Sequence, residues 1–165
     1  MHLLIAAVGR LKQGPERDLA LHYAQRIEAA GPGVSLGPLA VTELAESRAA
    51  TVELRKADEA ERLLTALAKA ETLIVLDETG KPQSSRQFAE TVGKLRDEGC
   101  GKLGFALGGP DGHAAMMRTP LGHARTVRVM SLGPMTLPHG LARIVLLEQI
   151  YRAVTLLAGH PYHRD

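Results

Sequence analysis

The side chains best suited to chemistry are concentrated near the C-terminus of the chain. His139, Arg143, Glu148 and Arg152 interrupt a long apolar run, and the chain ends as Gly-His-Pro-Tyr-His-Arg-Asp over residues 159–165. Chain ends usually carry a few dispensable polar residues. Here Tyr and His can stack on an unpaired base, and Arg can hold phosphate. The C-terminal segment is therefore predicted to bind a nucleic acid or another ligand.

Charge is distributed unevenly along the sequence. Residues 1–111 carry a net charge of −2, whereas residues 112–165 carry +4 and hold five of the seven histidines. The cations of the second part are all arginines, whose planar guanidinium suits contacts with phosphates and bases. An ordinary basic surface remains the alternative explanation of this charge.

Spacing within the run 139–157 predicts which polar side chains share a helix face. His139 and Arg143 are four residues apart, as are Glu148 and Arg152, so each pair shares a face. At about 100° per residue, Arg152 lies on the face opposite Arg143. Glu148 and Arg152 are expected either to form a half-buried ion pair or to face an active site shared within a dimer.

Alternation of apolar and amphipathic stretches predicts the elements that position these residues. An alternating order of strands and helices favours a mostly parallel sheet with helices on both faces, and one α/β domain over residues 1–165. Strands are expected at 3–8, 36–44, 72–76, 103–107 and 123–130, and helices at 16–30, 48–70, 85–98 and 138–158.

Three loops follow strands of this expected sheet. They are Leu76–Lys81, Gly108–Gly112 and Leu132–Leu137. Ligands of open α/β sheets bind at the carboxyl ends of the strands, and glycine lets a backbone approach a ligand closely. The three loops are expected to line one pocket, although each alone is also explained as a turn.

Several classes of protein are disfavoured. The single cysteine, Cys100, argues against a disulfide framework and fits a reducing compartment. The sequence has neither a phosphate-binding G-x-x-x-x-G-K-[ST] loop nor a dinucleotide fingerprint after a strand. His160 and His163 lack a third ligand, so no metal is expected. The apolar segment 1–8 is too short to span a membrane, so a cytoplasmic protein is expected.

Six blocks of sequence resemble the RlmH (YbeA) family, which are small bacterial ribosomal-RNA methyltransferases of the SPOUT class. The resemblance covers the whole chain, and the final His-Pro-Tyr-His is its most specific part. The blocks are Ala7–Gly9, Val75–Lys81, Leu107–Gly112, Met135–His139, Leu147–Ala153 and His160–Arg164.

The resemblance implies an α/β fold with a C-terminal trefoil knot, an exception to the rule that chains stay unknotted. It also implies that S-adenosyl-methionine binds in the knot, that the protein is a homodimer, and that it methylates N3 of a pseudouridine in 23S ribosomal RNA on the assembled ribosome. A non-catalytic ribosome-binding protein of the same fold is the alternative, and a small-molecule methyltransferase is a third possibility.

By motif match, the resemblance assigns roles to individual residues. It assigns contact with the RNA base or its phosphates to His139, Arg152, Tyr162 and His163, and cofactor binding to Leu76, Gly108, Leu132, Gly133, Pro134, Met135, Thr136 and Leu137. Together with the chemistry of the side chains, this predicts Arg152 and His139 as catalytic residues. The predicted RNA-binding residues are Arg143, His160, Tyr162, His163 and Arg164. Gly133 departs from the family, in which a serine is frequent in this loop, so a hydrogen bond there must come from backbone. Asp165 stands where the family usually has glutamate.

The expected reaction can be argued physically. An enzyme must align the methyl donor with the imide nitrogen and help that imide lose its proton. A cation such as Arg152 can stabilise the imide anion, and a neutral histidine can accept the proton. The sequence does not say which histidine acts. Residues 160–164 follow a helix stop at Gly159 and are expected to lie outside the core.

Overall fold

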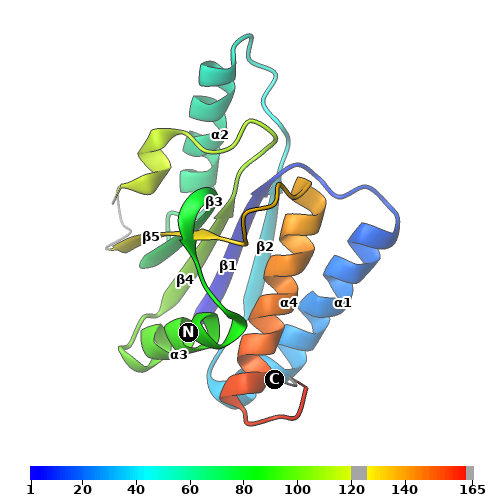
Figure 1. Cartoon of the computed structure of the whole chain (residues 1–165), viewed down its shortest axis with the longest axis vertical. Helices are drawn as coiled ribbons and strands as arrows, with labels where there is room; N and C mark the ends of the chain where they lie inside the picture. Colours follow the sequence, from blue (N-terminus) through cyan, green and yellow to red (C-terminus); the bar gives the residue numbers. More distant parts are fainter. Residues whose placement is uncertain (120–125, 163–165) are drawn as a thin grey trace.

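The computed structural model describes residues 1–119 and 126–162. Figure 1 shows helices packed around a central sheet. The elements are β1 (His2–Val8), α1 (Pro15–Ala30), β2 (Leu39–Leu44), α2 (Val52–Ala66), β3 (Thr72–Pro82), α3 (Ser85–Asp97), β4 (Lys102–Leu107), β5 (Thr126–Ser131) and α4 (His139–Leu157), with short 3₁₀ turns η1 (Gly31–Val34) and η2 (Ala115–Arg118).

The described strands form one sheet in the order β2-β1-β4-β3-β5. Every neighbouring pair is parallel. The α/β class and the parallel sheet predicted from the sequence are therefore confirmed. Each crossover carries the chain over a face of the sheet, which is why both faces are covered by helices.

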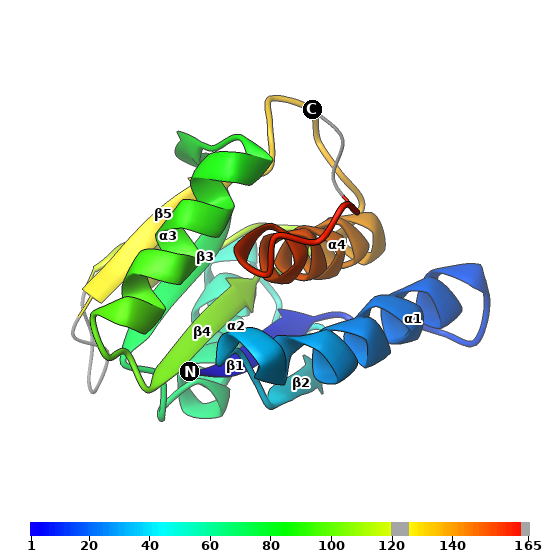
Figure 2. The same cartoon turned by 90° about the horizontal axis from the view of Figure 1, so that it is seen from below.

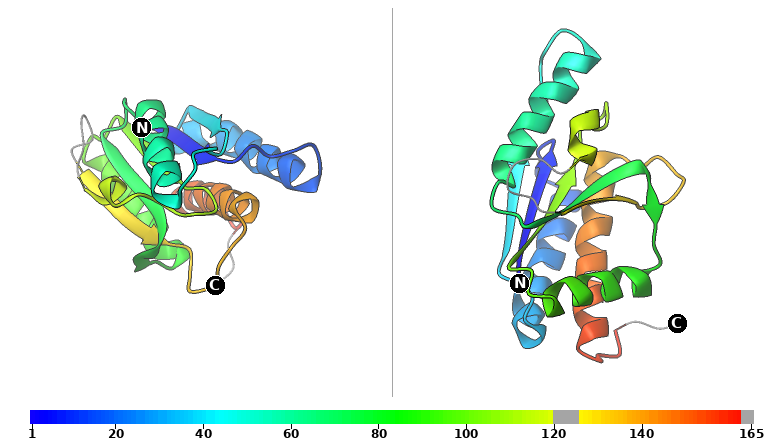
Figure 3. Two further views of the ribbon diagram at one scale, coloured as in Figure 1. Left: turned by 90° about the horizontal axis from the view of Figure 1, so that it is seen from above. Right: turned by 90° about the vertical axis from the view of Figure 1, so that its left-hand side faces the viewer.

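The two faces of the sheet bury separate apolar clusters. Helices α1, α3 and α4 pack on one face, against Leu3, Ile5 and Phe105. Helix α2 and the turn η2 pack on the other face, against Ala6 and Val75. Figures 2 and 3 show this division, with α1 and α4 side by side on their face.

Local sequence signals explain most of the helix boundaries. Ser84 caps α3 in a reciprocal capping box with Gln87, which starts the helix at Ser85. The helix expected over 48–70 is shorter at both ends, because the Thr51 hydroxyl accepts from the Leu54 N–H and starts α2 at Val52. Helix α4 ends at Leu157, and Gly159 follows with a positive φ of 66°, as expected of a glycine stop.

The strand expected over 123–130 is described from Thr126 as β5, and residues 123–125 lie outside the described part of the chain. Two other strands differ from their predicted bounds by more than one residue. The strand expected over 36–44 begins at Leu39, after Gly37 with a φ of 115°. The strand expected over 72–76 continues to Pro82, because the chain bulges after Leu76 and pairs again with β5 at Lys81 and Pro82. This extension brings residues 77–82 next to the end of β5.

Among residues 1–119 and 126–162, no helix combines the length and apolar character needed to cross a bilayer.

Candidate functional site

The carboxyl ends of three adjacent strands meet at one edge of the sheet. Leu76 of β3 is in register with Leu107 of β4 on one side and with Met130 of β5 on the other. Gly108, the residue after Leu107, therefore lies next to the position where the pairing of Leu76 ends. The loop after β5 begins two residues beyond Met130. The structure brings the three expected loops to the same edge, which is where parallel sheets bind ligands.

The loop 132–137 leaves room for a ligand next to its backbone. Gly133 has a φ of 131°, and a Cβ atom built there would meet no atom within 4 Å. The Ser131 hydroxyl donates to the Gly133 carbonyl at 3.0 Å and accepts from its N–H at 3.1 Å. Pro134, Met135 and Thr136 are exposed. A nearby hydroxyl thus orders the loop, although Gly133 itself has none.

A cavity of about 270 Å³ lies between the end of β5, the start of α3 and helix α4. Leu132 alone of the expected cofactor residues lines it, so the cavity and the edge beside Leu76 and Gly108 are separate features. Its lining is Gln83, Ser84, Ser85, Phe88, Met130, Ser131, Leu132, Val145 and Gln149.

The bulge that follows Leu76 is held by the Asp77 carboxylate. Asp77 Oδ1 accepts from the N–H and the hydroxyl of Thr79, and Oδ2 lies 2.9 Å from Arg118 Nη2. Burial opposes ionisation of Asp77, but these hydrogen bonds outweigh it and lower its pKa to about 2. The carboxylate is therefore ionised across the physiological range, and it ties the bulge to η2.

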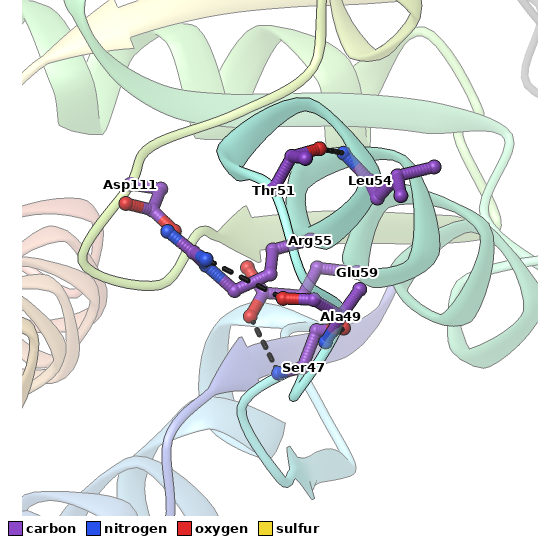
Figure 4. A network of polar contacts seen from close by, with 7 residues as sticks. All are labelled: Ser47, Ala49, Thr51, Leu54, Arg55, Glu59 and Asp111. Atoms are coloured by element: carbon purple, nitrogen blue, oxygen red, sulfur yellow. Dashed lines mark hydrogen bonds and ion pairs between the residues drawn. The ribbon is translucent and has the colours of Figure 1, made fainter.

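Helix α2 clamps the Gly108–Gly112 loop through Arg55, as Figure 4 shows. Arg55 Nε lies 2.6 Å from Asp111 Oδ2, and Arg55 Nη1 donates to the Ala49 carbonyl at 3.4 Å. The hydrogen bond from Arg55 lowers the pKa of Asp111. One guanidinium thus links the glycine loop to the segment that leads into α2.

A second contact from α2 to the loop is made by Glu59, which is 4% exposed. Its Oε1 accepts from the Ser47 N–H at 2.9 Å, and its Oε2 is buried without a hydrogen-bond partner among the described residues. A Cβ atom at Gly109 would lie 2.9 Å from Oε2, so only glycine fits over this carboxylate. Sequence reasoning missed the roles of Arg55 and Glu59, because nothing in their charged helix marks these two side chains as facing the interior.

Arg143 was expected to bind RNA, but the structure places it in the interior at 1% exposure. It forms an ion pair with Glu43 and donates to the Gly9 carbonyl, and Glu43 also accepts from the Leu11 N–H. Burial lowers the pKa of this guanidinium, whereas Glu43 opposes the shift. This geometry does not fit contact with RNA; it fits a role in fixing the β1–α1 loop on α4.

His139 is half-buried at the start of α4, directly after the 132–137 loop. A Cβ atom at Gly9 would lie 2.8 Å from the imidazole, so the ring packs on the Gly9 backbone. Since Arg143 holds the Gly9 carbonyl, the same loop that supports His139 is anchored one helical turn further along α4. Only glycine at position 9 leaves room for this ring.

Arg152 is held near the other end of α4. Its Nε and Nη2 donate to Glu148 Oε1 at 3.0 and 2.6 Å, which confirms the ion pair expected from their spacing. The side chains of Arg152 and Glu148 remain 27% and 17% exposed. Because thirteen residues separate His139 from Arg152, the two expected catalytic residues lie about 20 Å apart along one helix. One chain does not bring them together.

The described part of the tail folds back on its own domain. Tyr162 packs against the apolar cluster of α1, α3 and α4, and its ring meets Tyr151 edge to face with centroids 4.8 Å apart. The sequence predicts a tail outside the core, and Tyr162 is half-buried and packs against the core cluster without belonging to it, because an aromatic ring gains from burial even beyond a helix stop. His160 is exposed, and His163 and Arg164 lie outside the described residues.

Groups of three or more metal-ligating side chains do not occur within residues 1–119 and 126–162. What the described edge offers a ligand is backbone, glycine and apolar side chains, with His139 at the start of α4 directly after the 132–137 loop. Open parallel α/β sheets bind their ligands at the carboxyl edge of the strands, where these glycine loops lie.

A family model described as a predicted SPOUT methyltransferase matches residues 1–163. The chain belongs to this methyltransferase family.

Curated relatives match the chain over its full length. It is 52% identical to the ribosomal RNA large subunit methyltransferase H of Rhizobium meliloti (strain 1021) over 164 residues, covering 99% of both chains. It is 49% identical to the enzyme of the same name from Brucella anthropi over 165 residues, covering 100% of both. A Brucella abortus (strain S19) relative with this name is 47% identical, again over 100% of both chains.

Proposed function

We propose that this methyltransferase acts on large-subunit ribosomal RNA, and that it methylates N3 of a pseudouridine in 23S RNA on the assembled ribosome. The observation that carries the proposal is the match of about half of all residues, over full length, to enzymes named ribosomal RNA large subunit methyltransferase H. The basic segment 112–165 supports it, because arginines suit a phosphate-rich substrate.

The proposed methyl donor is S-adenosyl-methionine, bound at the edge where β4, β3 and β5 end. Leu76, Gly108 and the stretch 132–137 offer backbone donors and acceptors beside apolar surface, which suits an adenosine. The open space at Gly133 and the exposed loop around it fit such a group. Membership in the SPOUT family further implies a trefoil knot in the C-terminal half of the chain.

When bound, the cofactor supplies an electrophilic methyl group that passes from sulfur to nitrogen and leaves S-adenosyl-homocysteine. The N3–H of the base must give up its proton, and the imide then carries negative charge. Arg152 would stabilise that charge with its guanidinium, and His139 would accept the proton as a neutral imidazole. His160, Tyr162, His163 and Arg164 would hold the RNA.

A homodimer would solve a problem that one chain leaves open. His139 and Arg152 lie about 20 Å apart on α4, too far to act on one base. A second copy, with its own α4 in antiparallel orientation, would bring the Arg152 of one protomer to the His139 of the other. The exposed apolar side chains of Leu141 and Met135, 42% and 79% exposed, lie at the His139 end and suit such an interface.

The proposal places the protein in the cytoplasm with its ribosomal substrate. Mass spectrometry of 23S RNA tests it: ribosomes from a strain lacking this gene are incubated with purified protein and S-adenosyl-methionine. One added methyl group at N3 of a pseudouridine is expected, with free nucleosides left unmodified. Ribosome binding without cofactor binding or transfer would favour the non-catalytic alternative, and methylated free nucleosides would favour a small-molecule enzyme.

A further inference from the structure

A buried histidine joins the two strand ends that are assigned to the cofactor. His113 is 6% exposed, and its Nε2 lies 3.1 Å from the Leu76 carbonyl oxygen. A Cβ atom at Gly108 would lie 3.2 Å from Nε2 and from Cε1 of the same ring. One imidazole therefore contacts both Leu76 and Gly108, and it fills the space that a side chain at position 108 would need.

The contact between His113 and Leu76 lies directly beyond the last paired residues of β3 and β4. Strands β3 and β4 are in register up to Leu76 and Leu107, after which β3 bulges away. His113 then occupies the next position beside the Leu76 carbonyl. Because a carbonyl oxygen only accepts, Nε2 must carry the hydrogen, and Nδ1 then holds a lone pair. Nδ1 is buried and has no hydrogen-bond partner among residues 1–119 and 126–162.

The surroundings of His113 favour the neutral ring. Burial is the largest influence and lowers its pKa, and the Arg118 cation adds to this shift. Asp77 and the carbonyls of Leu76 and Ala106 oppose it without reversing it. Asp77 is itself engaged by Arg118 at 2.9 Å, and Asp111 on the same loop is engaged by Arg55 of α2. Neither carboxylate is free to move onto the imidazole.

We propose that His113 is a positioning residue for the methyl-donor pocket: the neutral imidazole ties Leu76 to the Gly108–Gly112 loop, and uptake of a proton at Nδ1 puts a charge into this buried site, which shifts the ring out of it and weakens cofactor binding. The protonated ring keeps its Nε2–H for the Leu76 carbonyl, but its charge is buried and lies near the Arg118 cation. The inference rests on the proposed function, because it takes Leu76 and Gly108 as cofactor residues.

Calorimetry with S-adenosyl-homocysteine between pH 8 and pH 5 tests this role. Affinity of the unmodified protein should be constant above pH 7 and should decline only below the ordinary histidine pKa of 6.5, because burial lowers the pKa of His113 and delays its uptake of a proton. His113→Gln places an amide nitrogen near the position of Nε2 and does not titrate, so it should bind within about threefold of the unmodified protein at pH 7.5 and lose the acid decline.

Two further variants complete the set. His113→Phe keeps a ring but donates no hydrogen bond, and it should bind at least about tenfold more weakly at every pH. His2→Gln replaces an exposed histidine of β1 and should keep the full acid decline. Thermal unfolding of each variant at each pH confirms that binding is measured on folded protein.

The outcomes separate this inference from the proposed function. Folded, unmodified protein that binds no S-adenosyl-homocysteine at any pH overturns the cofactor assignment, and the role of His113 with it. Normal binding with an acid decline that persists in His113→Gln, or normal binding by His113→Phe, overturns the role of His113 alone. If His113→Phe does not fold, NMR titration of the His113 ring decides: saturating S-adenosyl-homocysteine should lower its pKa further, and an unchanged pKa contradicts the inference.

Discussion

Arg143 and Arg152 lie on the same helix, nine residues apart, and their surroundings are opposite. Arg143 is 1% exposed and joins α4 to β2 through Glu43 and to the β1–α1 loop through the Gly9 carbonyl. Arg152 is 27% exposed and is held by Glu148 of its own helix, under the ring of Tyr162 at 5.1 Å. The first connects distant parts of the fold, whereas the second is held only locally.

This difference in burial and partners determines whether each arginine can contact a substrate. A buried guanidinium with long-range partners cannot turn toward a substrate without breaking the fold, since its charge would lose every compensating contact. A half-exposed guanidinium held by a neighbour four residues away can exchange that neighbour for a substrate anion at small cost, because such pairs contribute little to stability. Burial, rather than residue type, therefore separates a structural arginine from a candidate catalytic one.

The largest expected effect is that of Arg143→Ala on stability. The change leaves Glu43 and the Gly9 carbonyl without their partner and opens space in the core, so the free energy of unfolding should fall by about 3 kcal/mol. Urea unfolding followed by circular dichroism measures it. Arg143→Lys keeps the charge but lacks the planar fork, and should recover part of the loss. A loss below about 1 kcal/mol would contradict the structural role.

Arg152→Ala should have a small effect on stability and a large effect on turnover, whereas Arg143→Ala mainly lowers stability. Its expected effect on the free energy of unfolding is below about 1 kcal/mol, because the ion pair with Glu148 is local and half-exposed. If Arg152 stabilises the imide anion, turnover on ribosomes should fall about 100-fold with ribosome affinity changed less than about threefold. Single-turnover methylation measures the loss of turnover, and a ribosome binding assay measures the change in affinity. Equal losses in affinity and turnover would instead make Arg152 an RNA-binding residue.

Helical spacing predicted part of this arrangement. It placed Arg143 and Arg152 on opposite faces and paired Arg152 with Glu148, and both predictions are confirmed. It did not predict which face is buried, because that depends on Glu43, a hundred residues earlier, and on the loop at Gly9. Local periodicity fixes the relative directions of side chains, whereas tertiary contacts fix their surroundings.

The same limit applies to the candidate site. Alternating strands and helices predicted the parallel sheet, and glycine loops after strands predicted the shared edge. The imidazole of His113 and the clamp formed by Arg55 and Glu59 were missed, because each depends on contacts between segments far apart in the chain. The helix carrying Arg55 and Glu59 is mostly charged, and composition alone cannot distinguish a buried carboxylate from a solvated one.

Deletion of residues 162–165 should have a smaller effect than Arg152→Ala. The truncation removes the Tyr162 ring from Tyr151, a contact that is worth about 1 kcal/mol, so the domain should remain folded. Methyl transfer to ribosomes should nevertheless fall at least about tenfold, since side chains expected to hold RNA are lost. Calorimetry should give a nearly unchanged affinity for S-adenosyl-homocysteine. A truncated protein with the full rate of transfer would show that the tail only packs on its own domain.

The smallest expected effect concerns the Tyr162 hydroxyl, which lies over the locally held arginine and donates to Glu148 Oε1 at 3.4 Å. A hydrogen bond of this length is weak, so Tyr162→Phe should cost less than about 1 kcal/mol at neutral pH. Burial, together with Tyr23 and Glu148, raises the pKa of Tyr162 from 10 to about 12.

Because the folded state favours the neutral phenol, the hydroxyl's contribution is complete below pH 10 and is lost as the pH rises from 10 to about 12. The unmodified protein should therefore lose stability over this range relative to Tyr162→Phe, as measured by urea unfolding of both proteins at each pH. The difference between the two curves reports the Tyr162 hydroxyl together with the groups that act on it, Tyr23 and Glu148. Parallel curves would mean that the tail does not pack over Arg152 in solution. Arg152 would then be held by fewer contacts than the structure shows, in still greater contrast to the buried Arg143.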